Sequence, residues 1–76
     1  QNQKIKLYKL LGMETEKDFI EFITKGGQTF IRLYDEKKDI FSRIATVGRK
    51  LAQVSHNSNQ FFVFEYGKDF YILQKE

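Results

Sequence analysis

Basic side chains and one aromatic side chain lie close together near the start of this chain, a combination that can bind an anionic polymer. Residues 1–11 contain Lys4, Lys6 and Lys9 but no acidic residue, and Tyr8 lies among these lysines. Single-stranded nucleic acid binds where aromatic rings stack on its bases and cations surround its phosphates. The residues that we predict for such a platform are Lys4, Lys6, Tyr8, Lys9, Phe30, Arg32, Tyr34, Arg43, Arg49 and Lys50.

Acidic side chains cluster in the next segment and count against this platform. Residues 12–39 hold seven acidic and five basic residues, whereas residues 40–64 hold three basic residues and no acid. Carboxylates from residues 14–21 would repel phosphate groups if the fold placed them near the lysines. The net charge of +3 is therefore unevenly distributed, and a solvated surface of mixed charge explains the same pattern without an anionic partner.

Residues that support catalysis or metal binding are scarce. The chain has no Cys and a single His, His56, which lies in a polar stretch. Such a set cannot form a common zinc site other than one rich in carboxylates, and no nucleophile elbow precedes His56. Gly26-Gly27 lacks the Lys-Ser/Thr pair that follows a phosphate-binding loop. We therefore predict a non-enzymatic protein with no cofactor, no metal and no small-molecule substrate.

Length and composition are those of one small folded domain spanning residues 1–76. The chain is 41% hydrophobic and 16% aromatic, which is enough to build a core although 30% of residues are charged. The absence of Cys suits a reducing compartment, so we expect a cytoplasmic protein. No apolar run approaches the ~18 residues that span a bilayer, and no signal peptide is visible, so we expect no membrane partner.

The first strand is predicted over residues 4–8, where polar and apolar side chains alternate. Residues 18–35 fit two different structures. If Gly26-Gly27 is a two-residue turn, the flanking residues form a hairpin whose cross-strand pairs are consistent. Phe22 then faces Ile31, and Glu21 faces Arg32.

The alternative is a helix over residues 16–25. Thr15 and Asp18 resemble a capping box at its start, and Gly26 would terminate it. We favour the hairpin because its register pairs so consistently, and because Phe, Ile and Thr prefer strands.

The rest of the chain predicts a helix and a hairpin. Over residues 39–55, apolar residues recur at spacings of four, three, four and three: Ile40, Ile44, Val47, Leu51 and Val54. Residues 60–75 predict a hairpin about Gly67-Lys68, with a type II′ turn. In that hairpin the facing pairs are Phe64 with Tyr71, Phe62 with Leu73, and Val63 with Ile72. We assign Phe62, Phe64 and Leu73 to the core.

The predicted class is α+β, with a small, mostly antiparallel sheet and one amphipathic helix packed on one face. The predicted order is β-β-β-α-β-β, and the alternative helix gives β-α-β-α-β-β. Both hairpins are apolar on both faces, so the second face is left uncovered. Its predicted members, which could form an interface, are Phe19, Ile23, Phe61, Val63, Phe70 and Ile72.

An uncovered apolar face of this size is rare in a monomer. Either the sheet curls into a small barrel or sandwich, or the face contacts a second copy or another protein. The sequence thus leaves two functions open. One is a nucleic-acid-binding accessory or regulatory protein with a single-stranded partner. The other is a protein–protein interaction module or homodimeric subunit of a larger assembly.

Overall fold

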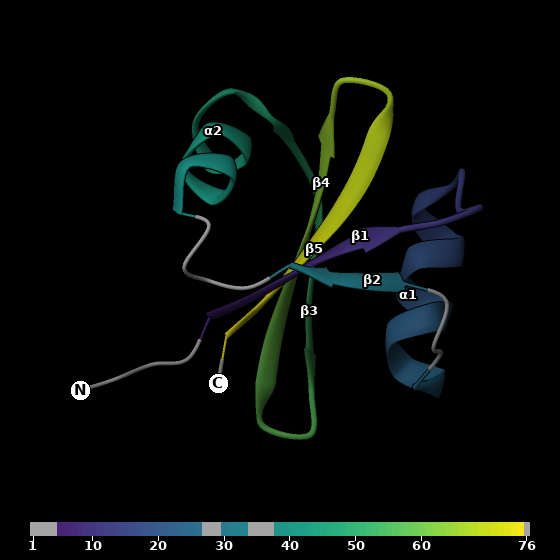
Figure 1. The fold of residues 1–76 in the computed structure, drawn as a ribbon. Helices are drawn as coiled ribbons and strands as arrows, with labels where there is room; N and C mark the ends of the chain where they lie inside the picture. Colours follow the sequence, from purple (N-terminus) through teal and green to yellow (C-terminus); the bar gives the residue numbers. More distant parts are fainter. Residues whose placement is uncertain (1–4, 27–29, 34–37, 76) are drawn as a thin grey trace.

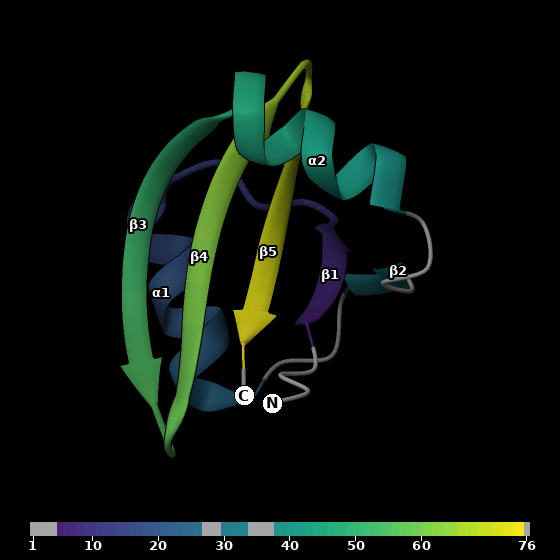
Figure 2. The ribbon, with the colours of Figure 1, turned by 90° about the vertical axis from the view of Figure 1, so that its left-hand side faces the viewer.

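A five-stranded antiparallel sheet carries one helix on each of its faces (Figures 1 and 2). The computed structural model describes residues 5–26, 30–33 and 38–75. The elements are β1 (Ile5–Leu10), α1 (Glu16–Lys25), β2 (Phe30–Leu33), α2 (Lys38–Val47), β3 (Arg49–His56), β4 (Asn59–Tyr66) and β5 (Asp69–Lys75). The strands lie in the order β2-β1-β5-β4-β3. The predicted α+β class is confirmed, but the observed order is β-α-β-α-β-β-β.

Residues 16–25 form α1, so the hairpin predicted for residues 18–35 is wrong and the alternative helix is confirmed. Thr15 is the N-cap, and its Oγ1 accepts a hydrogen bond from the backbone N–H of Asp18 at 3.1 Å. Gly26 ends the helix with φ 69° and ψ 38°, a left-handed conformation that glycine adopts without steric cost. The sequence thus carried both signals that begin and end the helix.

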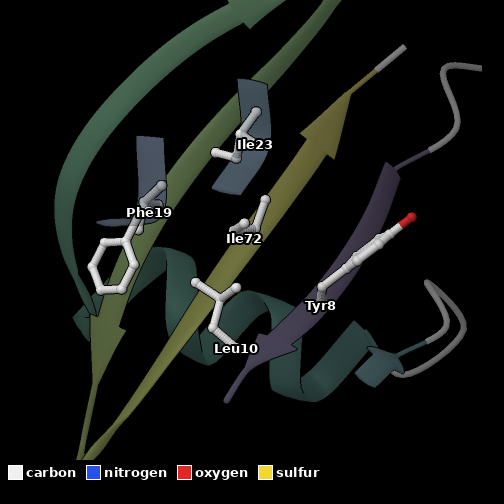
Figure 3. Packing of buried hydrophobic residues seen from close by; sticks show 6 residues of the cluster. Tyr8, Leu10, Phe19, Ile23 and Ile72 are labelled. Atoms are coloured by element: carbon white, nitrogen blue, oxygen red, sulfur yellow. The ribbon is translucent and has the colours of Figure 1, made fainter. Parts of the chain in front are cut away.

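Burial explains why the helix prevails over the hairpin. Phe19 and Ile23 are four residues apart, so they project from one side of α1, where they are only 0% and 7% exposed. They pack against Leu10 and Ile72 of the sheet (Figure 3). The Phe19 and Phe70 ring centroids are 4.8 Å apart. A hairpin would not bury these side chains against strands from both ends of the chain.

The strand predicted after Gly26-Gly27 does exist as β2, but with a different partner. β2 pairs with β1 in antiparallel register, with Leu33 opposite Leu7 and Phe30 opposite Leu10. β1 pairs on its other side with β5, so strands from the two ends of the chain lie side by side (Figure 1).

The helix predicted over residues 39–55 is wrong in its second half. α2 ends at Val47, and Arg49–His56 forms the edge strand β3 beside β4. Ile44 of α2 is buried, with 1% of its surface exposed. Val47, which was predicted in the same stripe, is 66% exposed.

A β-bulge explains why β3 resembled a helix in the sequence. The register of β3 against β4 shifts between Lys50 and Ala52. An extra residue in one strand shifts the usual alternation of sides by one position. Leu51, Ala52 and Val54 all pack on the same apolar cluster as a result. Leu51 and Val54 thus continue the helical spacing of Ile44 and Val47, although the backbone of β3 is extended.

Gly48 joins α2 to β3 where two backbones come close together. A Cβ atom at this position would clash with the carbonyl oxygen of Ile44 and lie 3.2 Å from that of Glu65. Backbone atoms cannot move aside as a side chain does, so Gly48→Ala is expected to lower the free energy of unfolding by about 1–3 kcal/mol. Urea denaturation followed by circular dichroism measures this loss. The exposed substitution Thr46→Ala serves as the control, and equal stability of the two variants would contradict the close approach.

The hairpin of β4 and β5 is confirmed in its predicted register. Tyr66 pairs with Asp69 around the two-residue turn, and Phe64–Tyr71, Val63–Ile72 and Phe62–Leu73 pair as expected. Gly67 has a φ of 65°, which the first position of a type II′ turn requires.

The hairpin of β3 and β4 was not predicted. Asn57 and Ser58 both have positive φ, at 51° and 68°, and His56 pairs with Asn59 around them. Positive φ at both central residues defines a type I′ turn, which Asn favours. The polar residues that follow the predicted helix over residues 39–55 therefore form a tight turn between two strands.

Each face of the sheet has its own apolar core. Beneath α1 lie Tyr8, Leu10, Phe19, Ile23, Val63 and Ile72. Beneath α2 lie Leu7, Ile44, Phe64, Tyr71 and Leu73. α1 therefore covers the second apolar face. The favoured hairpin had placed the residues of this helix in a strand of the sheet. Neither of the helices described here is long and apolar enough to cross a membrane.

Candidate functional site

A groove of about 400 Å³ lies on the α2 face of the sheet, beside the C-terminal end of α2. Its volume is in the range of natural ligand sites. The residues that line it are Ala45, Gly48, Lys50, Phe62, Phe64, Leu73 and Lys75. Two phenylalanines and two lysines are among the described residues of this lining, and no acidic residue is. The groove therefore combines an apolar floor with a cationic rim.

Strand register places Phe62 at the centre of this face. Phe62 lies opposite Gln53 of β3 and Leu73 of β5, and Gln60 lies opposite Lys75. Directly opposed residues project to the same side of a sheet, as do residues two apart on one strand. Phe62 is partly buried: it packs against the core beneath α2 and also lines the groove.

Two lysines from the strands on either side of β4 lie at this ring. The Nζ atom of Lys50 is 5.3 Å from the Phe62 ring centroid, and the Nζ atom of Lys75 is 6.0 Å from it. Both distances are within about 6 Å, the range in which a cation is attracted to the negative face of a ring. One aromatic ring thus has a positive charge beside it from β3 and another from β5.

A strip of hydrogen-bonded side chains runs from Lys50 along the neighbouring surface. Lys50 Nζ donates to Gln53 Oε1 at 3.4 Å, and Gln53 Nε2 donates to Gln60 Oε1 at 3.4 Å. All three residues are exposed. These side chains therefore form a polar border to the apolar groove.

The carboxylates of α1 lie on the other side of the sheet, whereas Asp39 belongs to the first turn of α2. Glu16, Asp18 and Glu21 are exposed residues of α1, and α1 covers the face opposite α2 (Figure 2). At the first residue of β3, Arg49 Nη2 lies 2.6 Å from Glu65 Oε1, so these two charges neutralise each other. The sheet thus separates the α1 carboxylates from the groove.

Most residues predicted for a nucleic-acid platform lie elsewhere. Tyr8 is 6% exposed beneath α1, and its hydroxyl donates to Gln74 Oε1 at 3.2 Å. Lys9 Nζ lies 3.5 Å from Asp69 Oδ2, and Arg43 is exposed on α2.

The remaining members of that set are scattered. Lys6 is half-buried on β1 opposite Gln74, while Phe30 and Arg32 belong to β2 at the edge of the sheet. Lys4 and Tyr34 lie outside the described residues. Of the predicted residues that the structure describes, Lys50 alone lines the groove.

The residues predicted for a protein interface share one side of the sheet but belong to the core beneath α1. Phe19, Ile23, Val63 and Ile72 are buried there, and Phe61 and Phe70 are partly buried against them. α1 would have to leave the sheet before a partner could touch the four buried side chains.

Sequence reasoning missed Phe62 as a site residue, together with Lys75, Gln53 and Gln60. The hairpin register that was predicted correctly contained part of the signal. Continuing it by one step on the same face places Lys75 opposite Gln60, next to the Phe62–Leu73 pair. Gln53 could not be found in this way, because β3 was predicted to be a helix.

Tyr71 lies beside the groove, opposite Phe64 on one side and Lys9 on the other. Burial raises the pKa of the Tyr71 hydroxyl, and the Asp69 carboxylate raises this pKa further, while Lys9 lowers it. The folded protein therefore favours the neutral phenol.

Alkaline pH is expected to destabilise the protein through Tyr71. Because its folded pKa is raised, its contribution to stability is fully present below about pH 10, where the unfolded tyrosine is neutral. That contribution is lost as the pH rises through the folded pKa. Urea midpoints measured at pH values on both sides of about 10 should fall more steeply for the parent than for Tyr71→Phe. Parallel pH profiles for the two proteins would contradict this assignment.

Within the described ranges, no group of three or more His, Cys, Asp or Glu side chains is placed to hold a metal ion. Comparison of the chain with protein-family models, with curated proteins and with solved structures yields no match. Its function must therefore be inferred from its own residues.

Proposed function

We propose that this protein binds single-stranded nucleic acid in the groove beside α2 and acts by binding rather than by catalysis. The observation that carries the proposal is the partly buried Phe62 ring with Lys50 and Lys75 beside it. Proteins that bind single strands combine an aromatic ring for a base with nearby cations for the phosphates. The described groove lining supplies both, with no carboxylate among them.

Each component has a definite role in this proposal. A base stacks on the exposed part of the Phe62 ring, an interaction worth about 1–3 kcal/mol whichever base it is. Lys50 and Lys75 have long flexible stems, so their ammonium groups can leave the ring and bind phosphates on either side of the base. A paired duplex does not offer an open base face, so a single strand is the expected partner.

The positions of the charges support one orientation of the nucleic acid. The exposed carboxylates of α1 lie across the sheet from the groove, where they repel phosphate from the wrong face. The concern raised by the acidic segment in the sequence is thereby reduced.

Substituting the ring is expected to weaken binding. Phe62→Leu keeps an apolar side chain but removes the flat ring face, so the dissociation constant should rise by about fivefold to more than a hundredfold. Fluorescence anisotropy of labelled single- and double-stranded oligonucleotides, at low and at physiological salt, measures this change. Phe61→Leu is the matched control, since Phe61 is the half-buried neighbour on the opposite face. Equal effects of the two substitutions would contradict stacking on Phe62.

Charge substitutions test the cationic rim in the same assay. Lys50→Glu with Lys75→Glu should weaken binding and flatten its dependence on salt, by a slope of about 0.7 for each phosphate that the protein no longer neutralises. Lys17→Glu with Lys25→Glu makes the same change in net charge on α1, across the sheet, and should have a much smaller effect. Absence of binding by the parent at low salt would reject the proposal.

A second candidate function, association with another protein, rests on different residues from those that the sequence predicted. Ile40 and Val47 are seven residues apart on α2 and are 38% and 66% exposed. Exposed apolar side chains on one helix flank can form an interface between two copies. If oligonucleotides fail to bind, and light scattering shows a concentration-dependent mass that Val47→Asp abolishes, self-association replaces nucleic-acid binding as the better proposal.

A further inference from the structure

The outer edge of β3 pairs with no other strand in the described part of the chain. We infer that this edge pairs with β3 of a second copy in antiparallel register, which joins two sheets into one. The association is separate from nucleic-acid binding in the groove, and it uses different residues from the flank of α2 that carries Ile40 and Val47.

Register shows which backbone groups of β3 face outward. His56 and Asn59 flank the two-residue turn, where paired residues exchange both backbone hydrogen bonds. Bonded and non-bonded pairs alternate along an antiparallel ladder, so Val54 also bonds to β4. Gln53 and Ser55 direct their N–H and C=O groups away from β4, and both residues are exposed. The second half of β3 therefore offers two donors and two acceptors to another strand.

Two copies of this edge fit each other about a twofold axis at Val54. In antiparallel pairing around that axis, Gln53 of each copy lies opposite Ser55 of the other, so their outward N–H and C=O groups all find partners. On the α2 face a carboxamide then meets a hydroxyl. On the α1 face the two Val54 side chains meet, and each is only partly buried within its own copy. The edge is thus complementary to itself on both faces.

The features that protect an edge strand from pairing occupy only the first part of β3. Arg49 and Lys50 carry its only charges, and the bulge lies between Lys50 and Ala52. Antiparallel pairing about Val54 directs the two basic ends away from each other, so like charges do not face each other. An uncharged edge of this kind suits an equally uncharged strand, and a second copy supplies one.

Such a dimer places both grooves on one face. The twofold axis is perpendicular to the sheet, so Phe62 and α2 of both copies lie on the same side. Three strand spacings, roughly 15 Å, separate the two copies of β4 that carry Phe62. If the proposed function holds, an oligonucleotide long enough to cross both grooves should bind more tightly than one that fills a single groove.

The test is the mass of the protein in solution, measured by analytical ultracentrifugation. From about 10 µM to about 1 mM, a range suited to a weak interface, the mass of the parent should rise toward that of a dimer. Ser55→Pro removes an outward N–H without breaking a bond to β4, so this variant should stay monomeric. Ser55→Ala keeps the N–H and should behave as the parent does. Circular dichroism checks that each variant is folded.

Disulfide crosslinking gives a second test that does not depend on the proline variant. The chain has no Cys, so one introduced thiol can form a disulfide only with a second copy. Under mild oxidation Val54→Cys should crosslink readily, because residues of a non-hydrogen-bonded pair have Cα atoms about 4.5 Å apart. Val47→Cys is the matched control: it is more exposed, at 66%, and should crosslink more slowly.

Three results would overturn this inference. They are a parent that stays monomeric up to about 1 mM, an association that Val47→Asp abolishes and Ser55→Pro does not, and faster crosslinking at Val47 than at Val54. None of them bears on the groove, because the anisotropy assay with Phe62→Leu tests the proposed function separately.

Discussion

Replacing Phe19 by alanine is expected to lower the free energy of unfolding by about 3–5 kcal/mol. Its ring is fully buried between α1 and the sheet and lies 4.8 Å from the Phe70 ring. Truncation leaves a cavity between two elements that hold each other in place. A domain of this length has a total stability of only about 4–11 kcal/mol, so the substitution should remove a large share of it. Urea denaturation followed by circular dichroism measures the loss.

Phe22→Ala is the control for this substitution. Phe22 belongs to the same helix and is half-buried, so its truncation should reduce stability less than that of Phe19. The hairpin predicted from the sequence gives the opposite ranking, because it places Phe22 on the helix-covered face and Phe19 on the open one. A larger loss for Phe22→Ala would therefore count against α1.

Ile44→Ala is expected to cost about 2–5 kcal/mol, again with urea denaturation as the measurement. Ile44 is 1% exposed and packs on the cluster between α2 and the sheet. No other apolar residue of α2 is among the fully buried side chains in the described part of the chain. Its loss should therefore detach α2 and damage the neighbouring groove.

Val47→Ala makes a change of similar chemistry three residues later, yet it should alter stability by no more than about 0.5 kcal/mol. Val47 is 66% exposed, because α2 ends there and the chain turns into β3. A single helix over residues 39–55 would bury both residues on one stripe. Comparable losses for the two substitutions would favour that helix over the observed bulged strand.

The groove and the acidic helix occupy opposite faces, and this arrangement depends on the topology. α1 and α2 lie on different sides of the sheet although they follow each other along the chain (Figure 2). The carboxylates of α1 are thereby separated from Lys50 and Lys75 by the thickness of the sheet. Charge counts along the sequence could not reveal this separation, since it depends on which side of the sheet each helix packs.

The candidate site could be predicted only in part. The combination of aromatic rings and lysines was recognised, and Lys50 was named, but the chosen rings were those expected on the sheet face that the predicted helix leaves uncovered. Tyr8 meets that pattern and is nevertheless buried, with its hydroxyl bonded to Gln74. Phe62 was assigned to the core because it lies among apolar neighbours. In the structure Phe62 is partly buried and packs against the core beneath α2, while it also lines the groove.

The sequence by itself determined the features whose energetics are local. The register about Gly67-Lys68 follows from a turn and from side chains that face each other within one hairpin. Thr15 and Gly26 supply the caps of α1 from residues next to it. The α+β class follows from the mixture of such signals.

The tertiary structure decided the rest. Residues 16–25 suit a helix or a strand, and the choice depends on the burial of Phe19 and Ile23 against strands from distant parts of the chain. The end of α2 and the bulge in β3 likewise depend on pairing with β4. A short apolar run contains only its own periodicity, whereas the free energy that selects its structure comes from surfaces that the fold brings to it.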